Sequence, residues 1–589
     1  SMSAGPDDTS TVNLGLGLER FGYFGLQSPA RATLILALVS ILAVLGLQRL
    51  KIDDSLSELL RTNTPEFRIY QSVSERFPSS EYDVLVVVEG KSLLAPIGIE
   101  AFRGAMIDLN LADGVKGAIS MLSARGQPDK SGYAPPIIAD QLPEGQAFAA
   151  AIQRLRNNDI VKGKFLSDDG ELALAVLALD RTEVEKHGLK KIIGGIDQTA
   201  RAGLAGSGLS VKLTGAPVMQ LEIRNAVERD QLIYNGLGLL FGAAIAIVFF
   251  RRVSFMLLAA LPPIIAVLWS LGLLGWFGFK QSLFLNVMTP LVMVMGFADS
   301  MQMTCAIRDR LRSGDTRDEA LAFAIRVVGP ACVLAHATAL LSFLALTISD
   351  SGLIRSFGAA GALATLVSYV AVIGMLPLLG RFLIRGEEGL GRERAPADHA
   401  PADRAMERLG QGVGWIVDRV VAKPVFFSAL GLALFVGFGL AHLSLKPRYR
   451  LADQVPDREQ ALKATSRLDQ KLTGANPAHV MIAWNHGASL YSGQVLDVIA
   501  AAHRTLENQA GLGNVWSIES LRRWLREHGD ERIETIKRYV GVLPEHLTRR
   551  FIAKEENAVL VTGRLPDVDA SQILPVIDRL DAALNEVRR

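Results

Sequence analysis

The stretch Met293-Val-Met-Gly-Phe-Ala-Asp-Ser-Met-Gln-Met303 places one carboxylate, Asp299, inside an apolar run that extends from Leu285 to Ile307. This run is long enough for a helix that crosses a bilayer, and Arg308 is the first charged residue after Asp299. At a helical rise of ~1.5 Å per residue, Asp299 lies about 13 Å inside the membrane face at which Arg308 is expected. An ionisable group at that depth costs at least ~2.5 kcal/mol, so it marks a functional site that usually includes a partner.

The composition indicates a membrane protein. The chain has 589 residues, of which 49% are hydrophobic, and its net charge of +2 gives no reason to expect a nucleic-acid partner. The two cysteines, Cys305 and Cys332, lie in apolar runs and predict no disulfide framework. Motifs for a phosphate loop, a zinc site or a nucleophile elbow are missing from any convincing context, so we expect no enzyme, no cofactor and no metal.

Apolar runs predict seven transmembrane helices. The first is expected at 32–48, five more within 233–380, and the seventh at 424–444. The five central runs are 233–250, 254–276, 284–307, 327–348 and 356–379.

The loops between these runs differ in charge, and the difference predicts an orientation. Five arginines lie between 308 and 326, whereas the loops on the other side carry only Lys280 and Arg355 as cations. The positive-inside rule then places the N-terminus and the arginine-rich loops in the cytoplasm. The expected location is the inner membrane of a bacterium, with two soluble domains, 49–232 and 445–589, in the periplasm.

The first soluble domain has the pattern of a split βαβ, or ferredoxin-like, α+β fold. Its expected strands are 82–89, 115–122, 171–179 and 209–214, its expected helices are 97–111 and 184–202, and a helical insertion is expected at about 123–165. The predicted fold class is therefore an α-helical membrane bundle with two periplasmic α+β domains.

Two further segments flank the bundle. Residues 1–31 contain a tag scar, Ser1-Met2, and an amphipathic segment at 13–26 that we expect on the cytoplasmic membrane surface. Residues 381–423 are expected to form a cytoplasmic linker that ends in an amphipathic helix at about 405–421.

The second half of the chain repeats the first. Ser28-Pro29 corresponds to Lys423-Pro424 and Val84–Glu89 to Val480–Asn485, and all such offsets lie between 386 and 397. In the second half the repeat stops before the last strand and five spans. We therefore expect a natural protein with twelve spans that continues for roughly 180–200 residues, as parallel-repeat transporters do. A natural seven-span protein is the alternative.

A second polar residue is expected to partner Asp299. His336 lies ten residues past Arg326, and Asp299 lies nine residues before Arg308, so antiparallel helices put both groups at one depth. Such a pair titrates as a unit, and histidine suits proton loading near neutral pH. Ser300, Gln302 and Thr338 are expected to join this proton relay, with Ser342 as a further member, and Gly296 to allow a close helix approach. The alternative is that the pair only holds helices together.

Several short motifs occur in one order along the bundle. They are Gly296-Phe-Ala-Asp299-Ser300, Gly329-Pro330, Thr338, Ser342-Phe-Leu-Ala-Leu346, Ser349, Phe357-Gly358 and Leu376-Pro377. In this set the chain resembles the resistance–nodulation–division (RND) superfamily, in particular its MmpL and hopanoid-transporter-like branch. Ser300 stands where that family usually has tyrosine, and His336 has no counterpart that we can place.

The resemblance implies a secondary active transporter that uses the proton-motive force. Its expected action is export of a hopanoid, sterol or related lipid from the inner membrane toward the periplasm or outer membrane. Expected partners are this lipid substrate, membrane lipids, and either a second copy or a periplasmic protein. The family pairs its fourth-span Asp with an Asp in the tenth span, which this chain lacks, so we expect the chain alone not to transport. The alternatives are a non-transporting lipid or sterol sensor or scaffold, and an accessory of protein translocation.

Overall fold

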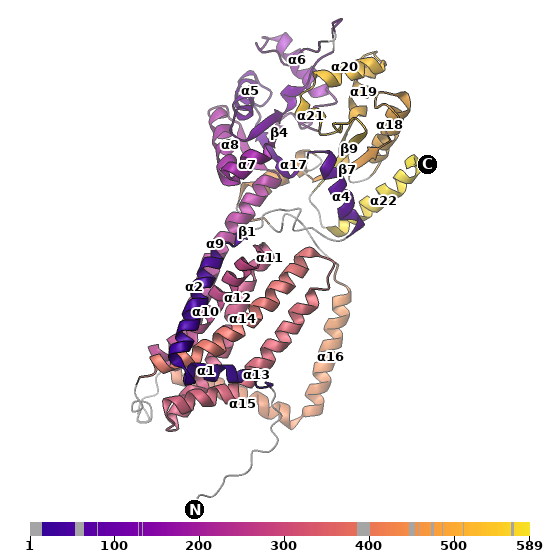
Figure 1. The fold of residues 1–589 in the computed structure, drawn as a ribbon. Coiled ribbons are helices and arrows are strands. Elements are labelled where there is room, and N and C mark those ends of the chain that lie inside the picture. Colours follow the sequence, from indigo (N-terminus) through magenta and orange to yellow (C-terminus); the bar gives the residue numbers. More distant parts are fainter. Residues whose placement is uncertain are drawn as a thin grey trace, which may run out of the picture. The chain divides into compact units, whose positions relative to one another are not determined.

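A computed structural model shows two compact units, which we describe separately (Figure 1). The helical unit contains residues 1–53, 58–62 and 227–445, and the α+β unit contains residues 54–57, 63–226 and 446–589. The structure describes residues 15–52, 64–78, 80–127, 129–131, 133–385, 401–446, 453, 455–456, 459–472, 476–485, 487–509, 512–566 and 570–588. The predicted tag scar and residues 386–400 of the predicted linker lie outside the described residues.

Seven helices in the described residues are long and apolar enough to cross a membrane, the number expected from the sequence. They are α2 (Pro29–Leu47), α9 (Ala216–Phe250), α10 (Val253–Trp276), α12 (Met288–Arg312), α13 (Arg317–Leu346), α14 (Gly352–Leu383) and α16 (Pro424–Leu443). A spanning segment must satisfy its backbone polar groups internally, so α10 remains one helix although it contains Pro262 and Pro263. Helix α13 begins at a capping box formed by Thr316 and Glu319.

Small residues bring α2 and α10 into close contact. A Cβ atom on Gly46 would overlap the carbonyl of Gly272, and one on Gly275 would overlap the carbonyl of Gly46. Glycine is therefore needed where these backbones cross. Helices α10 and α14 lie deepest in the unit, whereas α16 buries none of its residues.

The segment before α2 packs against the bundle. It forms a 3-10 turn, η1 (Leu18–Gly22), and the short helix α1 (Tyr23–Gln27), and both contact α13 and α14. Glu19, Gly22 and Gly25 are buried by this contact, and the guanidinium of Arg381 donates a 2.6 Å hydrogen bond to the carbonyl of Leu26. The segment thus has a buried face against protein, which a surface location alone does not predict.

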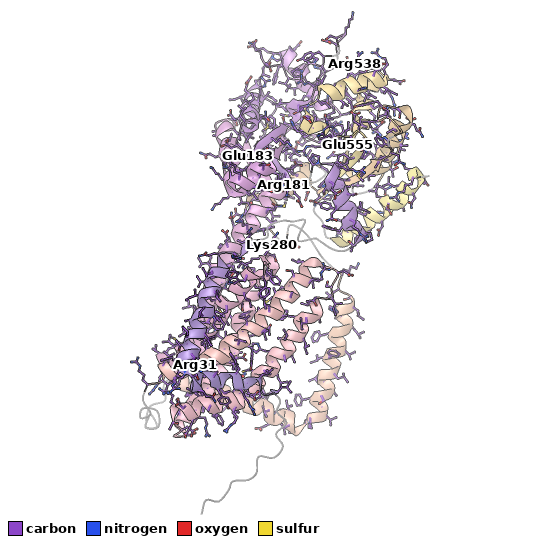
Figure 2. The ribbon with its side chains drawn as sticks, viewed as in Figure 1. Arg31, Arg181, Glu183, Lys280, Arg538 and Glu555 are labelled. Atoms are coloured by element: carbon purple, nitrogen blue, oxygen red, sulfur yellow. The ribbon has the colours of Figure 1, made fainter. Side chains whose placement is uncertain are left out.

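Three short elements and one longer helix complete the described part of the helical unit. They are the parallel strand pair β1 (Lys51–Ile52) and β6 (Lys280–Gln281), helix α11 (Leu283–Asn286) and helix α15 (Pro401–Ala422). Figure 2 shows Arg31 and Lys280 at opposite ends of this unit. The two sets of loops with different charge are therefore at opposite ends of the bundle.

The first domain of the α+β unit has a four-stranded antiparallel sheet in the order β3-β4-β2-β5. Its strands are β2 (Asp83–Glu89), β3 (Val115–Ile119), β4 (Leu172–Leu179) and β5 (Ser210–Thr214). Its helices are α4 (Pro65–Arg76), α5 (Pro96–Asn110), α6 (Gln146–Asn157), α7 (Arg181–His187) and α8 (Leu189–Gly203), with 3-10 turns η2 (Ser80–Tyr82) and η3 (Met121–Ser123). This strand order is that of the predicted split βαβ fold.

Two helix predictions for this domain need correction. The helix expected at 184–202 is broken at Gly188, which has φ +84°, and so becomes α7 and α8. The insertion at 123–165 is mostly loop, since its one α-helix is α6.

The second domain repeats the order of the first. Its described strands are β7 (Asn476–Ala483), β8 (Gly513–Trp516) and β9 (Ala558–Leu565), which form an antiparallel sheet in the order β7-β9-β8. Its helices are α17 (Gln460–Lys471), α18 (Gly493–Glu507), α19 (Ile518–Glu527), α20 (Ile533–Val542), α21 (Glu545–Thr548) and α22 (Ala570–Arg588).

The two domains exchange helices within the α+β unit. Helix α17 of the second domain packs on β5 of the first, where Gln460 accepts a 3.2 Å hydrogen bond from the backbone N–H of Leu213. At the other end, Phe77, which follows α4, packs with Ala558 and Leu560 of β9. The edge strand β5 is therefore covered by a helix that comes from the other repeat.

Candidate functional site

Helices α12 and α13 pack together and bring Asp299 and His336 into contact. Helix α12 runs toward Arg308 and α13 returns past Arg326, so the two side chains lie at similar depth, as predicted. Only 10% of the Asp299 side chain and 7% of the His336 side chain are exposed. The predicted pairing of these two residues is therefore present in the structure.

The hydrogen bonds of His336 assign its protons. Nδ1 lies 3.1 Å from the carbonyl oxygen of Thr365 on α14, and Nε2 lies 2.5 Å from Oδ2 of Asp299. A carbonyl oxygen can only accept, so Nδ1 carries a hydrogen. Nε2 and Oδ2 would both be acceptors unless one further proton lies between them. The pair in this geometry thus holds one labile proton and is neutral overall, and it becomes an anion when that proton leaves.

Several polar groups surround the pair. The hydroxyls of Ser300, Thr304, Ser368 and Tyr369 are buried and have no hydrogen-bond partner among the described residues. The ring of Tyr369 lies 5.6 Å from that of His336, and the thiol of Cys332 interacts with Asp299. Buried polar groups that protein leaves unpaired are commonly satisfied by ordered water. This arrangement is chemically suited to accept and release a proton.

Gly296 lies one helical turn before Asp299 and faces α10. A Cβ atom at this position would lie 3.1 Å from Cα of Pro263. The absence of a side chain lets α10 approach α12 next to the pair, as predicted from the sequence.

The structure corrects the position of three predicted relay residues. Gln302, Thr338 and Ser342 are exposed, and the two hydroxyls donate to carbonyls of their own helix, namely those of Leu334, Ala335 and Thr338. Thr338 is two residues from His336, which is about half a helical turn, and so points away from it. The prediction that Gln302 and Thr338 join the pair is therefore wrong, whereas Ser300 is buried beside it.

The sequence did not predict two neighbours of the pair, or a further buried acid near α13. Thr365 and Tyr369 lie four residues apart on α14 and therefore share one face. Glu19 is the one acid in the apolar segment 13–26. An acid in an apolar segment is a signal of the same kind as Asp299, but Glu19 is next to Arg20 and lies in a segment too short to be a span.

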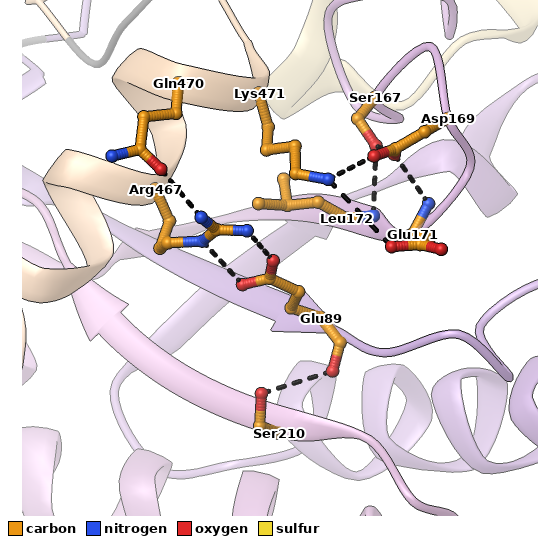
Figure 3. Close-up of polar contacts among 9 residues, drawn as sticks. All are labelled: Glu89, Ser167, Asp169, Glu171, Leu172, Ser210, Arg467, Gln470 and Lys471. Atoms are coloured by element: carbon orange, nitrogen blue, oxygen red, sulfur yellow. Dashed lines mark hydrogen bonds and ion pairs between the residues drawn. The ribbon is translucent and has the colours of Figure 1, made fainter.

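A second set of charged contacts joins the two domains of the α+β unit (Figure 3). Arg467 of α17 pairs with Glu89 of β2, and Lys471 pairs with Asp169. The hydrogen bond from Arg467 lowers the pKa of Glu89. Burial raises the pKa of Asp169, but hydrogen bonds from Lys471 and Ser167 outweigh this effect and bring it to about 2.

Another such contact involves a bidentate arginine. The two terminal nitrogens of Arg550 donate to the two carboxylate oxygens of Asp83 at 2.5 and 2.7 Å. The two arginine pairs are structural in character, because guanidinium groups do not give up their protons.

A polar cavity of about 340 Å³ also lies between the two domains, and Lys164, His503 and Glu507 contribute to its lining. Burial lowers the pKa of Lys164 to about 8 and that of His503 to about 3. His503 contacts Glu507 at 2.5 Å and Ser517 at 2.7 Å. Among the described residues, no group of three or more His, Cys, Asp and Glu side chains could hold a metal ion.

Comparison with known proteins identifies the family. The chain is 21% identical to membrane protein MJ1562 of Methanocaldococcus jannaschii over 381 residues, which cover 62% of this chain and 92% of that protein. It is 25% identical to membrane protein ActII-3 of Streptomyces coelicolor over 222 residues, which cover 37% of this chain and 31% of that protein. The sequence pattern of the MMPL family matches residues 62–427, more than half of the chain. The chain therefore belongs to the MMPL family of membrane transporters.

Proposed function

We propose that this protein acts in proton-driven export of a hydrophobic or lipid molecule, with hopanoids, sterols and related lipids as the cargo class. The observation that carries the proposal is the buried Asp299–His336 pair, in which Nε2 lies 2.5 Å from Oδ2, a hydrogen-bond distance that supports a shared proton. Family membership supports the transport of hydrophobic substrates. In this proposal the arginine-rich loops are cytoplasmic, and the α+β unit lies in the periplasm.

The pair can couple proton movement to helix movement. With its proton the pair is neutral and is compatible with burial among α12, α13 and α14. Without the proton it carries one negative charge, and a buried unpaired charge is strongly unfavourable. The two states therefore favour different helix arrangements, which is the condition for a proton gradient to drive a conformational cycle.

The test replaces Asp299 by asparagine in the gene at its own chromosomal position. Asparagine keeps the shape of the side chain but holds no labile proton. Lipidomics of separated inner and outer membranes is expected to show cargo retained in the inner membrane. Asp309→Asn is the matched control, because Asp309 lies on the same helix with 62% of its side chain exposed.

An unchanged lipid distribution in the Asp299→Asn strain would overturn the proposal. It would favour a sensor or scaffold in which the pair only joins helices. Whichever result is obtained, lipidomics on the purified protein would identify the bound lipid, which is the cargo of a transporter or the ligand of a sensor.

A further inference from the structure

The segment before the first spanning helix buries a second acid. Glu19, in η1, is only 7% exposed and lies against α13. A Cβ atom on Gly329 would overlap Cβ of Glu19, and a Cβ atom on Gly15 would overlap its carboxylate. Gly15 and Gly329 thus leave the space that the Glu19 side chain fills.

One oxygen of the Glu19 carboxylate, Oε2, is buried without a hydrogen-bond partner among the described residues. An ionised carboxylate without a partner is costly to bury. In a membrane bundle such a group is by default a candidate for proton or ion handling.

Glu19 lies on the side of the Asp299–His336 pair that faces the arginine-rich loops. Pro330 follows Gly329, which contacts Glu19. It precedes His336 by six residues on α13, which corresponds to ~9 Å along the helix. Helix α14 connects the two places, because the ring of Tyr369 on α14 lies 5.6 Å from that of His336 and α14 also contacts η1, which contains Glu19.

Unpaired hydroxyls lie along the same direction. Thr304 is five residues past Asp299 toward Arg308, and Ser368 adjoins Tyr369 on α14. The hydroxyls of Thr304, Ser368 and Tyr369 are all buried without a partner among the described residues. A row of such groups is the environment in which ordered waters and hydroxyls relay protons.

We propose that Glu19 is the second protonatable group of the relay, and that it exchanges protons between the Asp299–His336 pair and the end of the bundle with the arginine-rich loops. This inference rests on the proposed function. In the transfer step the bond that holds the labile proton of the pair breaks, and an O–H bond forms on the carboxylate of Glu19. The electron pair stays on the Asp299–His336 pair, which becomes anionic, while Glu19 becomes neutral. Release of the proton from Glu19 to water at that end of the bundle completes the transfer.

The test measures proton movement directly. The protein is produced from its complete gene and reconstituted in vesicles of the source cell's total membrane lipid, and an imposed pH gradient is followed with an entrapped pH-sensitive dye. Glu19→Gln is expected to lower the rate at least about tenfold, as loss of a proton-transfer group does. Glu19→Asp should restore part of the rate, and the exposed Glu407→Gln should leave it unchanged.

The outcomes separate this inference from the proposed function. A wild-type rate in Glu19→Gln, combined with an inactive Asp299→Asn, would overturn the role of Glu19 alone. Wild-type rates in both variants would overturn the proposed function. If Glu19→Gln does not fold, then Tyr369→Phe tests the proton route between Glu19 and the pair, because this substitution removes one hydroxyl and keeps the ring. A loss of about tenfold supports the route, and a wild-type rate overturns it.

Discussion

The helical unit and the α+β unit each contain a carboxylate paired with a basic side chain, but the basic side chain is a histidine in the first and an arginine in the second. In the helical unit Asp299 faces His336, whose imidazole has two ring nitrogens that can each hold a proton. In the α+β unit Asp83 faces Arg550, whose guanidinium stays charged at any ordinary pH. The first pair can therefore change its charge during a cycle, whereas the second can only hold two domains together.

The two pairs also differ in the hydrogen bonds made by the polar groups around them. Ser300, which adjoins Asp299, and Tyr369, whose ring lies 5.6 Å from that of His336, have buried hydroxyls without a partner among the described residues. The Asp83–Arg550 pair is held by two parallel hydrogen bonds, although Nε of Arg550 is buried without a partner among the described residues. Such a bidentate pair fixes the geometry of both side chains.

The largest expected effect comes from removing the imidazole that shares the labile proton, while a hydrogen bond to Asp299 is kept. His336→Gln can still bond Asp299, but it cannot become a cation, so proton-driven transport should fall at least about 100-fold. The rate is measured in reconstituted vesicles under a pH gradient, with thermal unfolding as a check on folding. Thr338→Val, on the same helix but pointing away from the pair, is the control. Transport by His336→Gln at the wild-type rate would show that the pair is only a contact between helices.

The second effect concerns stability rather than transport chemistry. Arg550→Ala leaves Asp83 half-buried without its partner, which should cost about 2 kcal/mol. The unfolding temperature of the α+β unit should then fall by at least about 4 °C. Arg532→Ala removes an ion pair with Asp530 in which 79% of the arginine side chain is exposed. This variant should change the unfolding temperature far less. Equal shifts in the two variants would contradict the distinction between them.

The smallest effect is a pH dependence at the contact of Lys471 with Asp169. Folding lowers the pKa of Asp169 from 3.8 to about 2, so the stabilisation is present above the higher value and is lost as the pH falls toward the lower one. In Lys471→Met the pKa of Asp169 should rise, and acid unfolding should begin at a higher pH. Circular dichroism against pH measures this midpoint, with the exposed Lys191→Met as control. An unchanged midpoint would mean that the contact does not stabilise the folded state.

The sequence was sufficient to predict the spans and the Asp299–His336 pair, because depth in a membrane depends only on helical rise and on where the flanking arginines lie. It was not sufficient to predict the direction in which Gln302 and Thr338 point. That direction depends on the rotation of each helix against its neighbours, which packing at contacts such as Gly296–Pro263 determines.

Two further features depended on three-dimensional context. The burial of Glu19 requires the space above Gly329, which lies more than 300 residues away in the chain. The break at Gly188 requires a positive φ, and nothing in the local sequence distinguished this glycine from the others. The strand order, by contrast, followed directly from the alternation of strands and helices.

The helix exchange between the repeated domains has a consequence for the timing of synthesis. Thr214 of β5 bonds Thr465 of α17, and 251 residues separate them. At about 5–20 residues per second, a ribosome needs roughly 12–50 s to make that interval. During this time the edge of β5 is without the helix that later covers it, while six spanning helices of the described residues are made in between. The first domain is thus the earliest part of this unit to be translated. Its strand β5 stays uncovered until α17 is made, and a chaperone could bind this exposed strand edge in the interval.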